Sequence, residues 1–162
     1  MSDKKLTHTN AKGEARMVDV GGKPDSERYA RASGRVHVSA ELLARLRENS
    51  LKKGDALAAA RIAGILAAKK TAEIIPLCHT LPLTSVSVEL TLNEESSTVE
   101  IMAETRTNYK TGVEMEALVA VSTAALTIYD MGKAIDKNMT IEAVRLLEKS
   151  GGQSGHWLRK DA

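Results

Sequence analysis

The sequence predicts an α+β fold in which helices pack on one face of a mainly antiparallel sheet. Apolar and polar residues alternate in two neighbouring segments, 84–92 and 98–106, across a short polar turn. This pattern is typical of a hairpin with one buried face. The segment 112–137 instead repeats apolar residues such as Val121 and Ile128 at a spacing of seven, as on one face of a helix.

The N-terminal residues 1–32 are expected to form a partly irregular arm, followed by one α+β domain over 33–162. The arm is polar, and two glycines and Pro24 interrupt it. Residues 17–20 are expected to form a short edge strand. Such an arm either wraps a neighbouring subunit or frays, and the sequence leaves both readings open.

The first half of the domain predicts a strand and two helices. Residues 35–38 form the strand, and Ser39 is placed to cap a helix over 40–48. Asp55 is placed to cap a second helix, 56–74, whose small residues allow another backbone to approach closely. A proline ends this helix and opens a loop that two prolines stiffen.

The second half predicts the hairpin, the long helix and a last strand. A helix over 112–137 would be about 39 Å long. Residues 141–149 are expected to return as a strand. The order strand, two helices, hairpin, helix, strand suggests a ferredoxin-like arrangement of the sheet.

The composition narrows the class of protein. The chain has 162 residues, a net charge of +2 and four aromatic residues (one Trp, three Tyr), which disfavours a nucleic-acid partner. The single Cys78 excludes an internal disulfide and suits a reducing compartment. Neither a signal peptide nor a membrane-spanning run is recognised, so we expect a cytoplasmic protein with no membrane partner.

Metal and nucleophile motifs are missing from the sequence. The four histidines and Cys78 have no spacing typical of a metal site, so no metal is predicted. Cys78 fits a small buried residue better than an attacking thiolate. His79, in the proline-stiffened loop, is either a structural histidine or a substrate ligand or acid–base group.

The polar stripe of the long helix has two interpretations. Glu116 and Asp130 lie fourteen residues apart, about 21 Å along the axis. They therefore serve different sites or opposite ends of an elongated site that another chain completes. The alternative is a charge bias at the helix ends plus a surface pair between Asp130 and Lys133.

Several lysines indicate phosphate binding. The Gly-rich segment 149–155 begins with a lysine but is no Walker A loop, and a flexible tail is the alternative. Lys53, Lys69, Lys133 and Lys149 all fall near the ends of predicted elements. If they converge with carboxylates, they suit a polyphosphate-bearing substrate and acid–base chemistry.

The motifs together resemble the cyclic pyranopterin monophosphate synthase family (molybdenum-cofactor biosynthesis protein C, MoaC). The resemblance covers nearly the whole chain and is carried by residues 6–23, 52–71, 74–83, 111–137 and 145–155. It implies a lyase-type enzyme that converts 3′,8-cyclo-7,8-dihydro-GTP to cyclic pyranopterin monophosphate and releases pyrophosphate. It also implies a ferredoxin-like fold and a hexamer, a trimer of dimers, with active sites at subunit interfaces.

The resemblance assigns roles to residues by their position. The catalytic group is Asp130 with Lys133 and Lys53. The substrate-binding positions are Leu77, Cys78, His79, Met115 and Glu116, supported by Arg28, Lys69, Glu114 and Lys149. No cofactor is required, and whether Mg²⁺ accompanies the substrate phosphates stays open.

Two rival functions predict different behaviour. A non-catalytic nucleotide-sensing module would use the lysines and the Gly-rich tail to bind ligands without turnover. A scaffold would use the long helix and the arm for assembly and would ignore nucleotides. The pairing of Asp130 with Lys133 at matching family positions favours the enzyme.

Overall fold

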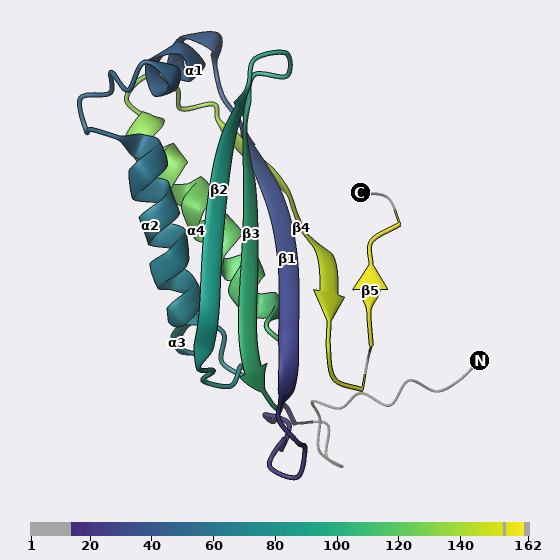
Figure 1. Cartoon of the computed structure of the whole chain (residues 1–162). Coiled ribbons are helices and arrows are strands. Elements are labelled where there is room, and N and C mark those ends of the chain that lie inside the picture. The colour runs from purple at the N-terminus through teal and green to yellow at the C-terminus, as the bar shows by residue number, and fades with distance from the viewer. Residues whose placement is uncertain (1–13, 154, 161–162) are drawn as a thin grey trace.

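The computed structural model describes residues 14–153 and 155–160, which form a five-stranded antiparallel sheet and the helices beside it (Figure 1). The sheet has the order β2-β3-β1-β4-β5. The strands are β1 (Ser26–His37), β2 (Leu83–Asn93), β3 (Thr98–Tyr109), β4 (Thr140–Ser150) and β5 (Trp157–Leu158). The helices are α1 (Ala40–Arg47), α2 (Ala56–Lys69), α3 (Thr71–Ile74) and α4 (Glu114–Gly132).

The strand order confirms the predicted fold class. β1 lies in the middle of the sheet and pairs antiparallel with β3 on one side and β4 on the other. β2 and β3 form the predicted hairpin, with Asn93 opposite Thr98. Both connections that carry helices return to the same sheet, as in a ferredoxin-like fold.

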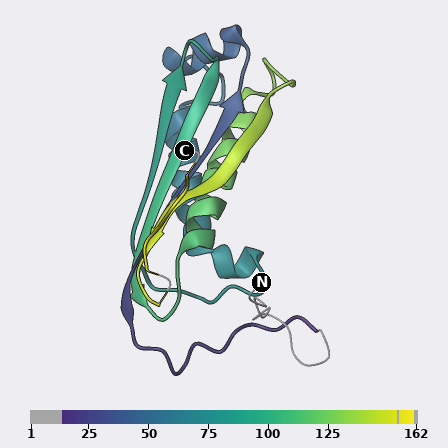
Figure 2. The same ribbon diagram turned by 90° about the vertical axis from the view of Figure 1, so that its right-hand side faces the viewer.

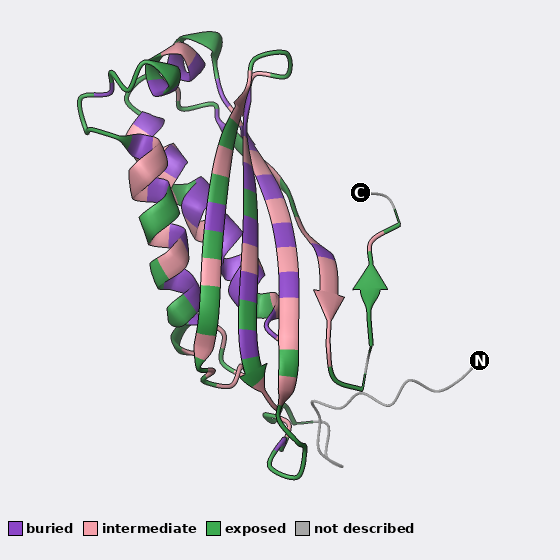
Figure 3. Ribbon diagram, viewed as in Figure 1, coloured by how far each residue is buried: buried purple, intermediate pink, exposed green. Residues whose placement is uncertain are grey.

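α2 and α4 cover one face of the sheet, and within residues 14–153 and 155–160 no helix lies on the other face (Figures 1 and 2). Buried and less buried residues alternate along β1 and β3, as the coloured bands in Figure 3 show. The buried side of β1, including Ala32 and Val36, joins the core with Val121 and Ile128 of α4. The apolar stripe predicted for the long helix is therefore the face that packs on the sheet.

Small residues allow α2 and α4 to pack closely, as the sequence predicts. A Cβ atom at Gly64 of α2 would lie 2.9 Å from the backbone oxygen of Ala120 in α4. The opposite side of α2 is not buried, since Ile62 is 59% and Leu66 is 52% exposed. The helix is thus buried on one side only.

β1 is longer than the sequence predicts. It begins at Ser26, so the expected boundary between residues 32 and 33 falls inside a strand. Pairing with β3 from Ser26 onward, and with β4 from Tyr29 onward, holds the polar first half of β1 in the sheet. The expected strand over 17–20 is absent, and that segment is irregular. Residues 1–13 of the predicted arm lie outside the described residues.

Two predicted helices are shorter in the structure. The expected helix 56–74 is divided at Lys70 into α2 and α3. The expected helix 112–137 ends at Gly132, where a Cβ atom would lie 2.7 Å from the side chain of Leu42. α4 is therefore about 28 Å long rather than 39 Å.

Among the described residues, no helix is long and apolar enough to cross a membrane.

Candidate functional site

A carboxylate and two ammonium groups meet at the C-terminal end of α4. Lys53, from the loop before α2, donates to Asp130 Oδ2 at 3.0 Å and to the Asp130 backbone oxygen at 2.8 Å. Lys133 donates to Asp130 Oδ1 at 2.7 Å. We call these three residues the Asp130 cluster. It contains every residue that the family resemblance assigns to catalysis.

The two lysines set the charge of the Asp130 cluster. Hydrogen bonds from Lys133 and then Lys53, together with their charges, lower the pKa of Asp130. The hydrogen bond to Asp130 in turn raises the pKa of Lys133. At neutral pH Asp130 is therefore a carboxylate and Lys133 an ammonium group, and their mutual contact holds both in these charged forms. Proton transfer by either group requires a bound substrate to disturb this contact, because each shift moves the pKa away from neutral pH.

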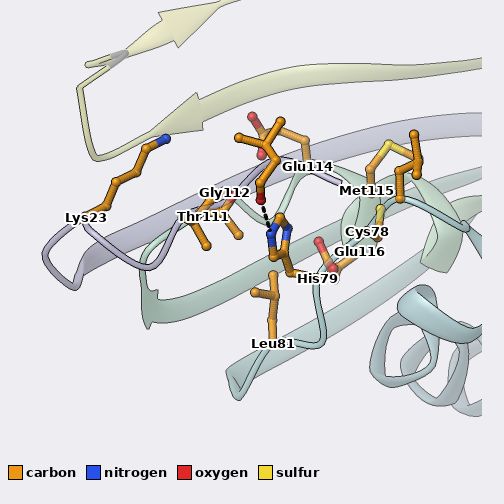
Figure 4. A pocket seen from close by; sticks show the side chains of 12 residues that line it. Lys23, Cys78, His79, Leu81, Thr111, Gly112, Glu114, Met115 and Glu116 are labelled. Atoms are coloured by element: carbon orange, nitrogen blue, oxygen red, sulfur yellow. Dashed lines mark hydrogen bonds between the residues drawn. The ribbon is translucent and has the colours of Figure 1, made fainter. Parts of the chain in front are cut away.

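A cavity of about 430 Å³ lies at the other end of α4, beside its first turn (Figure 4). We call it the α4 cavity. The arm before β1, the proline-stiffened loop and the start of α4 each contribute to its walls. It is lined by Val18, Val20, Lys23, Leu77, Cys78, His79, Leu81, Thr111, Gly112, Glu114, Met115 and Glu116. All five residues expected in the substrate-contacting loop and the second contact therefore lie at one cavity.

The arm fixes the tautomer of His79. His79 Nε2 lies 2.8 Å from the backbone oxygen of Val18, the interaction dashed in Figure 4. Because a carbonyl oxygen only accepts, Nε2 must carry the hydrogen. In the neutral ring Nδ1 is then the nitrogen that can accept a hydrogen bond from a ligand.

Glu116 is a buried carboxyl group in the floor of the α4 cavity, only 3% exposed. Burial raises its pKa to about 7, aided by the charge of Glu114 and opposed by a backbone hydrogen bond. Burial, and then the charge of Glu116, also raises the pKa of the neighbouring Cys78. Cys78 is thus a neutral thiol at physiological pH, in agreement with the sequence interpretation that it is no attacking thiolate. It is only partly buried and lines the cavity, whereas the sequence interpretation expected a buried residue.

The raised pKa of Glu116 predicts a loss of stability as pH rises. The folded chain holds a proton that the unfolded chain releases between pH 4.5 and about 7, so stability declines across this window by about 3 kcal/mol. Glu116→Gln, which stays neutral, should flatten this decline. Urea unfolding at about pH 5 and about pH 8 measures both slopes, and equal slopes would contradict the buried-acid assignment.

A second cavity, of about 380 Å³, adjoins the first. It is lined by all of the Lys and Arg residues that line either of these two cavities. We call it the cationic cavity. Its charged lining residues are Lys23, Arg28, Lys110, Lys149 and Glu114. It shares Lys23, Thr111, Gly112 and Glu114 with the α4 cavity. A ligand with an apolar ring and a phosphate chain can therefore occupy both.

The supporting residues that the family resemblance implies do not all lie at the same cavity. Arg28 lines the cationic cavity and donates to the backbone oxygens of Tyr109 and Lys110 at 3.3 and 3.4 Å. Lys149 pairs with Glu114 on the same cavity. Lys69 lies apart from them, on a cavity of about 50 Å³ beside His79 and Glu116.

Sequence reasoning missed Lys23 and Lys110. One lies just before β1 and the other just after β3, and Ser26 pairs with Tyr109 where the two strands meet. Antiparallel pairing therefore brings both lysines to one end of the sheet. The full length of β1, had it been predicted, would have revealed them.

The structure places the two groups of expected residues at opposite ends of α4. The helix is continuous from Glu114 to Gly132, which separates Glu116 from Asp130 by about 21 Å along the axis. Within one chain the Asp130 cluster therefore does not reach the α4 cavity.

Among the described residues, no group of three or more His, Cys, Asp or Glu side chains is arranged to hold a metal ion.

Comparisons with known proteins show which family the chain belongs to. The model of the MoaC family matches residues 17–152. The chain is 56% identical to the cyclic pyranopterin monophosphate synthase of Thermomicrobium roseum, over 96% of this chain and 94% of the relative. It is 59% identical to that of Roseiflexus castenholzii, over 96% and 97%, and 52% identical to that of Parvibaculum lavamentivorans, over 99% and 100%. The chain therefore belongs to the MoaC family.

Proposed function

We propose that this chain is a cyclic pyranopterin monophosphate synthase of molybdenum-cofactor biosynthesis. It converts 3′,8-cyclo-7,8-dihydro-GTP to cyclic pyranopterin monophosphate and releases pyrophosphate. The observation that carries the proposal is the identity of 52–59% to synthases of that name over nearly the full length of both chains. A small-molecule biosynthetic role also suits a cytoplasmic location.

The two adjoining cavities support a substrate of this class. The α4 cavity combines apolar side chains such as Leu81 with Glu116 and His79, which can bind the polar edge of a heterocycle. The cationic cavity adds three lysines and Arg28, which suit a triphosphate. This cation set supports phosphate binding without a resident cofactor.

The position of the Asp130 cluster supports an active site shared between chains. We assign proton transfers to Asp130 and Lys133, with Lys53 helping to neutralise phosphate. Because this cluster lies at the far end of α4 from the cavities, a second copy must supply it to the bound substrate. A hexamer built as a trimer of dimers provides such contacts.

The chemistry requires the residue types found at both ends. The rearrangement opens and recloses rings, which needs repeated proton transfers between a base and an acid. In the cyclisation step a ribose hydroxyl oxygen bonds to the α-phosphorus and loses its proton to a base. The bond from that phosphorus to pyrophosphate breaks, and nearby ammonium groups stabilise the charge on the leaving group.

The test is turnover by the purified full chain. Supplied with 3′,8-cyclo-7,8-dihydro-GTP, it should release pyrophosphate and form a product with the mass of cyclic pyranopterin monophosphate, whereas GTP should give neither. Lys53→Ala should slow release by roughly 100-fold, while the matched Lys52→Ala should not. Tight binding of the substrate without any turnover would instead establish a non-catalytic nucleotide-binding module.

A further inference from the structure

The ion pair between Glu114 and Lys149 lies on the boundary between the two cavities. Lys149 Nζ is 2.6 Å from Glu114 Oε1, and the two side chains are only 31% and 27% exposed. The Glu114 carboxyl group folds back over Gly112, so closely that a Cβ atom at Gly112 would overlap it. This carboxylate therefore sits inside the mouth of the cationic cavity.

Glu114 differs in charge from the other charged residues around it. Among the described residues that line the cationic cavity, it is the sole carboxylate beside three lysines and Arg28. Arg28 donates to backbone oxygens, and Lys110 donates to the backbone oxygen of Gly21 at 2.8 Å. Those partners are neutral, whereas the partner of Lys149 is an anion in the place where a phosphate oxygen would bind.

We propose that Glu114 is a built-in competitor for phosphate at Lys149. A bound phosphate group displaces the carboxylate from the ammonium group, and the carboxylate returns as pyrophosphate departs. This inference rests on the proposed function for the identity of the leaving anion.

The competition follows from the charges and the space at Lys149. Two anions that share one partly buried ammonium group repel each other, so each weakens the binding of the other. The cost is a lower affinity for phosphate than the four cations could give. The gain is faster product release, which limits turnover in many enzymes. Glu114 thus sets the affinity for pyrophosphate and the rate of its escape.

The experiment measures binding of inorganic pyrophosphate to the full chain by calorimetry. Glu114→Gln keeps the shape of the side chain and removes its charge, and it should bind pyrophosphate about tenfold more tightly than the wild type. Glu41→Gln is the matched control, since Glu41 is an exposed carboxylate in the first turn of α1 that lines neither cavity, and it should leave the affinity unchanged. Misfolding of the variant would lower the affinity for pyrophosphate, so an increase in affinity cannot be a consequence of misfolding.

A double-variant cycle tests whether Glu114 acts through Lys149. Lys149→Met should weaken pyrophosphate binding, and adding Glu114→Gln to it should give little further gain. Pyrophosphate affinity in both Glu114→Gln and Glu114→Ala that equals or falls below the wild-type value overturns the inference. The two proposals fail separately: tighter binding without wild-type turnover rejects only the synthase, whereas turnover with unchanged affinity in the variants rejects only the competitor role.

Discussion

Asp130→Asn is expected to lower the rate of pyrophosphate release by roughly 1,000-fold, because the amide cannot accept a proton. In the wild type, Lys53 and Lys133 keep Asp130 ionised by hydrogen bonds of 3.0 and 2.7 Å. The amide keeps the shape of the side chain and loses the negative charge. The loss should appear in kcat, with a smaller change in KM, because the proposed function places the substrate rings and phosphates mainly at the two cavities.

Two controls separate catalysis from folding for this variant. The Asp130 side chain is 58% exposed, so its substitution should leave the thermal unfolding midpoint nearly unchanged. Asp136→Asn changes another carboxylate near the end of α4, one that accepts hydrogen bonds from the backbone N–H groups of Ser39 and Asn138, and should keep most of the activity. Near-normal rates for both Asp130→Asn and Lys53→Ala would refute the assigned catalytic cluster.

Co-expression of two inactive variants is expected to restore activity if two chains build each site. One variant carries Asp130→Asn, and the other carries Arg28→Ala with Lys149→Ala in the cationic cavity. In a randomly mixed assembly about a quarter of the sites combine an intact Asp130 from one chain with an intact cavity from its neighbour. Pyrophosphate release should therefore rise from near zero to about a quarter of the wild-type rate.

The matched control pairs two variants at the same end of α4. Asp130→Asn mixed with Lys53→Ala should show no such recovery, since both substitutions fall in one cluster and no cluster regains both residues. Differential affinity tags verify that the chains assemble together. If tagged chains co-assemble and the first mixture stays inactive, the shared site is rejected.

Local sequence patterns were sufficient to predict much of the fold. The hairpin of β2 and β3 was predicted because alternation depends on residues two apart. The helix caps were predicted for a similar reason: Ser39 Oγ accepts from the Leu42 backbone at 3.3 Å, and Asp55 accepts from that of Ala58 at 2.9 Å. Both interactions span only three residues.

Elements that depend on distant partners were predicted less well. The first half of β1 has no alternating apolar pattern and becomes a strand because of its neighbours: Glu27 pairs with β3, and Arg31 pairs with both β3 and β4. β5 has only two residues, too few for a periodic signal, and is held by Glu148 and Lys149 of β4. Strand pairing over such distances is not encoded in local periodicity.

The sequence by itself determined which reactive side chains exist and that Glu116 and Asp130 lie far apart on one helix. Only the tertiary structure decided their partners. Lys53 reaches Asp130 across 77 residues of sequence, and sheet register gathers Arg28, Lys110 and Lys149 around one cavity. The physical reason is range: helix and strand periods arise from neighbours in sequence, whereas the charge and burial of a site arise from segments that meet only after the chain folds.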